Sequence, residues 1–303
     1  MHSDLRPATT DGQAPNLAVA VAVAVVIPTL AAPSSLRKLL HSLKCQTVQP
    51  CQIVVVFQGD DAGLHRLESM REIVDFDVVR CLPGLARARN IGVKALHTAW
   101  DAVAIPDDDV VYDVDALARF GTHIKQGVGI VSARVTDLVG NTRLRYSTTE
   151  RVLNGRDVWR CAIEAGLAYA SSCLSDVGGF DEQLGLGAET PWQSGEGTEL
   201  LLRSMASRYR VVFDPSIVVV EQELYSVTGP VRAETRARRY ARGTGRVYAL
   251  RHTRLEQCGL VCRSLAHIIL GVMRRDGTAV SRASAVLVGR VEGLIGRTVG
   301  STE

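Results

Sequence analysis

The sequence predicts an α/β protein with a mainly parallel central sheet that is covered by helices. Short apolar runs rich in Val and Ile alternate with stretches of helical periodicity through the first two thirds of the 303 residues. Strands that alternate with helices in this way imply right-handed crossovers and parallel neighbours. A hydrophobic share of 46% and a charged share of 22% are typical of a globular chain that buries a core.

The first strand is expected at 17–27, where valines alternate with alanines before Pro28. This run has no basic flank and is too short to span a membrane, so it is interpreted as a buried strand rather than a signal peptide. Residues 1–16 are polar and contain Pro and Gly, and we expect them to be a disordered tail.

The remaining elements follow in regular alternation. Four leucines at i, i+3, i+4 and i+7 behind Ser34 or Ser35 predict the first helix. The same kind of spacing places further helices at 62–72, within 85–100, at 114–126 and at 196–208. Runs rich in Val and Ile place further strands at 52–57, 77–80, 102–105, 129–135, 209–213 and 216–220. The polar stretch that ends near 165 has no clear pattern, and 166–174 is an apolar segment.

Charge and cysteine content exclude several classes of protein. The net charge is only +3, but the stretch from Arg232 to Arg297 contains fourteen arginines, no lysines and four acids, so the C-terminal part is basic. Its arginines are neither interleaved with aromatic residues nor set in a known module, so we expect no nucleic acid partner. Seven cysteines without a C-x-x-C pair argue against a disulfide framework and a zinc ribbon, and favour a reducing, cytoplasmic compartment.

Three consecutive aspartates, Asp107, Asp108 and Asp109, follow the strand expected at 102–105. In an extended backbone Asp107 and Asp109 point the same way and can reach one hard cation, whereas Asp108 points elsewhere. Mg²⁺ held by one or two carboxylates, or Mn²⁺ in the same role, completes its shell with water and phosphates, so a nucleotide diphosphate is the natural partner. The alternative is a solvated turn whose aspartates cap the next helix.

Two other stretches are expected near this triplet. Pro28 and Thr29 also follow a strand, and in such sheets ligands bind beyond the carboxyl ends of the strands, so we expect one shared crevice. Arg87 and Arg89 lie at the start of a helix, where cations oppose the helix dipole and so indicate a nearby anion. We expect Arg89 to contact a phosphate, whereas Arg87 fits a surface arginine equally well.

A third group of candidate residues lies in the glycine-containing stretch 176–203. Trp192 offers a flat apolar face suited to a sugar ring, with plain packing as the alternative. Glu196 and Glu199 lie at the start of a helix, where the dipole stabilises the ionised carboxylate that a general base needs. Either can serve as that base, and Glu199 can instead complete a helix cap.

Taken in order, these motifs resemble family 2 glycosyltransferases, which have the GT-A fold. The likeness covers roughly residues 22–222 and rests on the segments VVIPT, IVVV, GLARARNIG, PDDDV, GGFDEQLGLG and GEGTELLLR. The segment 238–252 is also similar to one that follows the catalytic domain in bacterial members that build surface polysaccharides. The resemblance implies a GT-A catalytic domain over 17–228 and a basic helical extension over 229–303.

The resemblance implies an inverting transfer of sugar from a nucleotide diphosphate sugar to the hydroxyl of a saccharide or lipid-linked acceptor. Asp107 and Asp109 match the DXD metal motif, with Mg²⁺ or Mn²⁺ neutralising the departing diphosphate. Glu196 matches the first acid of the family's ED pair, and Trp192 is expected on the acceptor side. The residues expected to contact the nucleotide sugar are Pro28, Thr29, Gln58, Arg89, Asp107 and Asp108.

Two positions depart from the family pattern. The family often has Asp after the second strand to contact the base or ribose, whereas this chain has Phe57 and Gln58, so the nucleotide stays open. Gly197 replaces the second acid of the ED pair, which leaves Glu196, or failing that Glu199, as the base. One rival is a sugar nucleotidyltransferase, which would carry a Gly-rich basic loop after the first strand. Another is a non-catalytic membrane-surface scaffold.

The basic extension alternates arginines with apolar stretches. We expect no segment in it to reach the roughly 20 apolar residues that cross a bilayer, but arginine-rich amphipathic helices bind anionic lipid surfaces. The extension therefore either lies on the inner face of the cell membrane, near a lipid-linked acceptor, or forms a helical pair. Such a pair would pack on the catalytic domain or on a second subunit.

Overall fold

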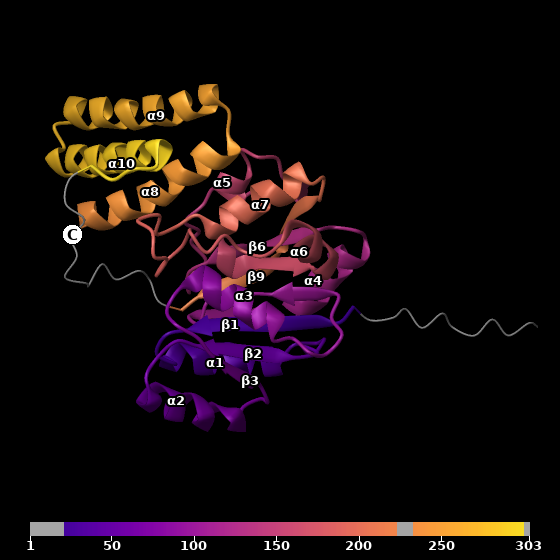
Figure 1. The fold of residues 1–303 in the computed structure, drawn as a ribbon. Helices are drawn as coiled ribbons and strands as arrows, with labels where there is room; N and C mark the ends of the chain where they lie inside the picture. Colours follow the sequence, from indigo (N-terminus) through magenta and orange to yellow (C-terminus); the bar gives the residue numbers. More distant parts are fainter. Residues whose placement is uncertain (1–20, 223–232, 300–303) are drawn as a thin grey trace, which may run out of the picture.

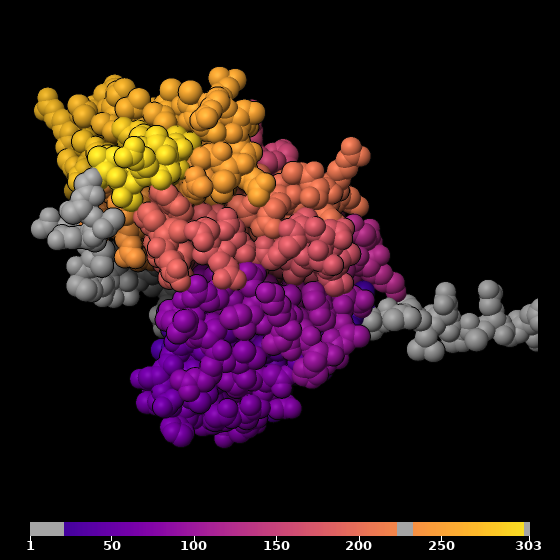
Figure 2. Space-filling model, in the orientation of Figure 1, coloured from indigo at the N-terminus to yellow at the C-terminus, as the bar shows by residue number. Residues whose placement is uncertain are grey.

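The computed structural model describes residues 21–222 and 233–299, and the tail expected over 1–16 lies outside them. One sheet forms the centre of the molecule, helices cover its two faces, and three further helices stack at one end (Figure 1). In the space-filling view this end layer lies directly on the sheet-containing part (Figure 2).

The central sheet has nine strands. They are β1 (Val23–Thr29), β2 (Ile53–Phe57), β3 (Asp77–Arg80), β4 (Ala102–Ala104), β5 (Val110–Tyr112), β6 (Ile130–Thr136), β7 (Arg151–Val152), β8 (Leu167–Ala170) and β9 (Val211–Glu221). Their order is β3-β2-β1-β4-β8-β6-β9-β5, with β7 beside β9. Neighbours from β3 to β4 are parallel, as are β6 and β9, whereas β5, β7 and β8 run antiparallel to their partners. The predicted α/β class is confirmed, with a sheet that is parallel in its first half and mixed in its second.

Helices pack on both faces of this sheet. They are α1 (Ser34–Lys44), α2 (Asp61–Glu68), α3 (Leu85–Lys94), α4 (Ala116–Lys125), α5 (Val158–Cys161), α6 (Ser171–Val177) and α7 (Glu196–Ala206), with the short turns η1 (Ser69–Glu72) and η2 (Glu164–Gly166). Alternate residues of β1 point to opposite faces. Val25 and Ile27 pack with Leu39 of α1 in one core, and Val26 packs with Ala88 of α3 in the other.

Two predicted strand boundaries are corrected. β1 begins later than expected and continues to Thr29. The strands expected at 209–213 and 216–220 form one strand, β9. A bulge between Asp214 and Val218 absorbs the extra residues and keeps both halves of β9 paired with β6.

The antiparallel strands are the part of the sheet that sequence patterns do not predict. β8 and the first turn of α6 lie in the apolar segment 166–174, and β8 enters between β4 and β6 in the opposite direction. The segment from 137 to 166 contains the two-residue strand β7, the short α5 and η2. Both β7 and β8 run opposite to β6.

The C-terminal extension is helical as expected, and its described residues 233–299 form a layer of three helices rather than the pair that was one alternative. They are α8 (Ala233–Arg251), α9 (Arg254–Met273) and α10 (Gly277–Ile295). α8 packs on α7 and against α10, and α9 lies outermost (Figure 1). A Cβ at Gly245 of α8 would lie 2.1 Å from the carbonyl oxygen of Arg290, so the two backbones touch there. The buried carboxylate of Glu292 in α10 accepts hydrogen bonds from Arg238 and Arg242 of α8.

α9 has the length and composition of a helix that can cross a membrane. It is 20 residues long, and most of it is exposed. The expectation that no segment of the extension reaches this length and apolar content is therefore wrong. This statement about α9 rests on its length and composition alone. Exposed apolar side chains such as those of α9 usually mark a surface that contacts a membrane or another protein.

Gly92→Ala should destabilise the protein because α3 lies close to the sheet at this residue. A Cβ at Gly92 would lie 2.2 Å from Val26 Cγ1 and 2.8 Å from Val56 Cγ2. Overpacking of this kind costs about 1–3 kcal/mol, measured from urea unfolding. Gly259→Ala is the control, because nothing lies within 4 Å of a Cβ there and alanine favours a helix by about 1 kcal/mol. Equal unfolding midpoints for the two variants would contradict the packing.

Candidate active site

A buried arginine joins three segments at the carboxyl end of the parallel strands. Arg89 of α3 is 1% exposed and donates hydrogen bonds to Glu196 Oε1 at 3.0 Å and Asp107 Oδ1 at 3.1 Å. Its guanidinium carbon lies 5.3 Å from the centre of the Phe180 ring. Burial alone would lower the pKa of Arg89, but Asp107 and Glu196 raise it above its ordinary value. The charged arginine therefore holds α3, α7 and the segment after β4 together.

The acidic triplet faces in more than one direction, and its backbone turns at Asp108 and Asp109 rather than staying extended. Asp107 turns to Arg89 and keeps 41% of its side chain exposed, whereas Asp108 accepts a hydrogen bond from the Thr29 hydroxyl. Burial raises the pKa of Asp108 to about 6, the Thr29 hydroxyl opposes this shift, and Asp109 and Asp107 add to it. The ends of β1 and β4 thus form one site.

The other residues expected at the nucleotide lie at the ends of β1 and β2. Pro28 pairs with Val56 inside the sheet. The Gln58 backbone N–H donates to the Thr29 carbonyl at 2.9 Å, and its side-chain oxygen accepts from the Gly84 N–H at 2.8 Å. Gln58 therefore fixes the turn that precedes α3.

The two arginines of α3 have different surroundings. Arg89, expected to contact a phosphate, is buried and engaged by two carboxylates. Arg87 pairs with Glu182 at 3.4 Å and with Glu189 at 3.1 Å, and both acids are exposed. Arg87 is therefore the surface arginine of the pair, and Arg89 belongs to the interior of the site.

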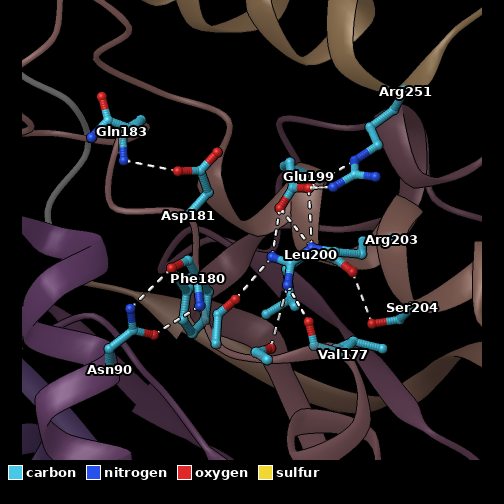
Figure 3. Close-up of polar contacts among 12 residues, drawn as sticks. Asn90, Val177, Phe180, Asp181, Gln183, Glu199, Leu200, Arg203, Ser204 and Arg251 are labelled. Carbon is cyan, nitrogen blue, oxygen red and sulfur yellow. Dashed lines mark hydrogen bonds and ion pairs between the residues drawn. The ribbon is translucent and has the colours of Figure 1, made fainter.

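Glu199, the second candidate base, is surrounded by arginines (Figure 3). Its side chain is 1% exposed and accepts hydrogen bonds from Arg203 Nη2 at 2.7 Å and from Arg251 Nε at 2.7 Å. Arg203 also donates to the Gly179 carbonyl at 2.8 Å. Because Arg251 belongs to α8, this carboxylate ties α7 to the extension. These contacts account for Glu199 without a role in proton transfer.

Trp192, expected on the acceptor side, lies in the core. The residue is 7% exposed, and Arg246 of α8 lies 5.9 Å from the centre of its ring. It belongs to the same buried cluster as Val247. The structure therefore favours the packing alternative for this indole.

One acidic residue of the site is absent from the sequence predictions. Glu164 lies in η2, just before β8. Burial and repulsion by Glu196 raise the pKa of Glu164 to about 7, and Arg89 opposes the shift. A single acid inside the otherwise apolar stretch 161–170 is the signal that points to it, because lone acids are rarely placed in buried segments.

A second group of metal-capable side chains occurs in the described part of the chain. His123, Glu150 and Asp214 have ligand atoms within 4.8 Å of one another. His123 Nε2 lies 2.9 Å from Asp214 Oδ2, and Asp214 also accepts from the Ser216 hydroxyl. Asp214 lies at the bulge of β9, so its bonds to His123 and Ser216 stabilise the backbone there and account for the group without a metal ion.

The fold is shared with solved proteins. Glycosyltransferases of the GT-A fold have the same kind of α/β sheet with helices at its end. Residues 24–168 match the model of glycosyl transferase family 2. The resemblance drawn from the sequence motifs is confirmed.

Curated relatives come from one species. A "Pre-mycofactocin glycosyltransferase" of Mycobacterium tuberculosis, in strains CDC 1551 / Oshkosh and ATCC 25618 / H37Rv, is 26% identical over 285 residues. The match covers 88% of this chain and 56% of the relative. The chain therefore spans little more than half the length of the curated protein that it matches.

Solved structures share the fold at low sequence identity. The mannosyltransferase PcManGT from Pyrobaculum calidifontis, in complex with GDP-Man and Mn²⁺, has a TM-score of 0.59 and 16% identity, over 90% of this chain and 86% of that one. S. aureus TarS 1-349 in complex with UDP has a TM-score of 0.55 and 15% identity, over 91% and 92%. An overlap of this extent includes at least part of the C-terminal helices.

Glu199→Gln should lower the free energy of unfolding by about 2–3 kcal/mol. The substitution removes the buried charge that pairs with both Arg203 and Arg251. The expected loss of stability is small for a buried ion pair because Arg251 is 32% exposed. Glu189→Gln is the control: its carboxylate is 83% exposed, and loss of its pair with Arg87 should cost less than about 0.5 kcal/mol in the same urea titration. If Glu199→Gln is as stable as the control variant, the link between α7 and α8 is not a structural one.

Proposed function

We propose that the protein transfers a sugar, with inversion, from a nucleotide diphosphate sugar to an acceptor hydroxyl. The observation that carries this proposal is the cluster around Arg89, which sets Asp107 and Glu196 beside the ends of β1 and β4. The family match supports it, as do neighbours solved with UDP, UDP-GlcNAc or GDP-Man. The proposed acceptor is a saccharide or a lipid-linked molecule in polysaccharide or glycoconjugate synthesis.

Asp107 and Asp109 are the proposed ligands of Mg²⁺ or Mn²⁺. Their donors are carboxylate oxygens, which suit these ions better than zinc, and 41% of the Asp107 side chain is open to solvent and phosphates. The mannosyltransferase neighbour was solved with Mn²⁺. When bound, the ion neutralises the negative charge that develops on the diphosphate leaving group.

The chain's own residues position the donor. Arg89 fixes the direction of Asp107, Thr29 fixes that of Asp108, and Gln58 holds the turn before α3. A nucleotide at the ends of β1 and β2 then presents its diphosphate to the triplet. Attack by the acceptor oxygen from the opposite side of the anomeric carbon inverts that centre, and the acceptor proton passes to a carboxylate of the site.

Asp109→Ala and Asp107→Asn should each lower nucleotide release at least about 100-fold, because charge on the leaving group is no longer neutralised. Release of UDP from UDP-GlcNAc and of GDP from GDP-Man, with Mn²⁺, measures this. Calorimetry should show donor binding at least about ten-fold weaker. Asp75→Ala is the control, since that side chain is 98% exposed. Near-normal turnover in both variants, or a wild-type protein that binds neither donor, would remove the proposal.

The outer helix of the extension is the proposed contact with an anionic membrane surface. Leu265, Ile269 and Val272 of α9 are exposed at helical spacing i, i+4, i+7, and Arg263 and Arg274 flank them. Anionic lipid headgroups attract such arginines while the apolar side chains enter the interface. This contact would hold the protein at the inner, cytoplasmic face of the membrane, where a lipid-linked acceptor is available.

Leu265→Asp combined with Ile269→Asp should reduce binding to vesicles of phosphatidylglycerol and phosphatidylcholine at least about ten-fold, because two exposed apolar side chains that would enter the lipid are replaced by charges. Co-sedimentation measures this. Leu138→Asp, at a residue that is 67% exposed in the sheet domain, is the control. Unchanged vesicle binding would contradict the membrane contact. If the wild-type protein is a dimer and the double variant is a monomer, α9 belongs to a subunit interface instead.

A further inference from the structure

The first turn of α7 has no room for a side chain at Gly197. A Cβ there would lie 2.2 Å from Cγ, 2.7 Å from Oε1 and 2.8 Å from Cδ of Glu164. All three of these atoms belong to one carboxyl-bearing side chain, so Glu164 fills the space in front of Gly197. A carboxylate in this place lies at the positive end of the α7 dipole.

Sheet topology explains how a residue of η2 reaches this place. β8 runs antiparallel to β4, with Ala104 opposite Ala168. The segment before β8 therefore lies beside the segment after β4, which is the acidic triplet. The Tyr112 hydroxyl donates to the Ala165 carbonyl at 3.3 Å, which anchors η2. Glu164 is thus placed at the same edge as Asp107 by strand pairing rather than by proximity in sequence.

The carboxylates around Arg89 differ in how they are engaged. Glu196 and Asp107 each form an ion pair with Arg89. Glu164 forms no ion pair and accepts no side-chain hydrogen bond from residues 21–222 or 233–299. An ion-paired carboxylate is a weakened base, whereas a partly buried and unpaired one with a pKa near neutrality suits proton transfer. Glu164 therefore differs from Glu196 and Glu199, which are both engaged in ion pairs.

We propose that Glu164 is the general base that accepts the proton of the attacking hydroxyl. This assignment rests on the proposed function. As the acceptor oxygen bonds to the anomeric carbon, the bond from that carbon to the diphosphate oxygen breaks, and its electron pair leaves with the nucleoside diphosphate. The acceptor proton moves to a carboxylate oxygen of Glu164. Glu196 is then a positioning residue that acts through Arg89.

Glu164→Gln should lower nucleotide release by about 100-fold or more, the scale of a lost general base, while donor affinity with Mn²⁺ changes less than about two-fold. The substrates are UDP-GlcNAc and GDP-Man, and water serves as the acceptor. Attack by water also requires a base that takes its proton, so hydrolysis of the donor tests the role of Glu164. Normal release and normal donor binding would overturn the role of Glu164 and leave the transferase function standing. A wild-type protein that binds neither donor would overturn both.

Moving the carboxylate from residue 164 to residue 197 tests whether the reaction needs the acid itself or only the packing of the Glu164 side chain. Glu164→Ala combined with Gly197→Asp moves the acid to the neighbouring helix, into the space that Glu164 vacates. This double variant should recover at least about ten-fold of the turnover lost in Glu164→Ala alone, if a carboxylate in this place is what the reaction needs. Glu164→Ala with Gly197→Asn is the matched control of the same size without charge. Equal recovery in that control would show a packing effect and overturn the proposal.

Discussion

The acidic edge of the sheet depends on one buried guanidinium. Arg89 lies out of contact with water and is stable there only because Asp107 and Glu196 neutralise it. The same pairing fixes two carboxylates that come from segments far apart in the chain, one after β4 and one at the start of α7. Removal of either acid would take away one of the two ion-pair partners of Arg89, so the geometry of the site and the stability of its surroundings depend on the same contacts.

α7 links this edge to the rest of the molecule. Its first residue, Glu196, faces Arg89, and one turn later Glu199 is held by Arg203 and by Arg251 of α8. A movement of the C-terminal helices would therefore act directly on α7 through the pair of Glu199 and Arg251, which Figure 3 shows. If α9 contacts a membrane, as proposed, that contact is two helices away from the site through packed side chains.

The sequence predicts the parallel half of the fold and the meeting of Thr29 with the acidic triplet, because both follow from local periodicity and a general rule about strand ends. It does not predict the antiparallel placement of β8, which depends on pairing between distant segments. The place of Glu164 in the site is not predictable for the same reason. Residue type alone makes Trp192 and Glu199 candidates, and only the packing of α8 on α7 shows that Trp192 lies in the core and Glu199 in an ion-pair network.

The late position of β8 in the chain has a consequence for synthesis on the ribosome. β4 and β6 are complete before residues 167–170 emerge, yet these residues form the strand that separates them. Until then both strands present open backbone edges, which are liable to pair with other chains. The nascent protein is therefore exposed to aggregation during this interval, and slow translation of the stretch just before β8 would lengthen it.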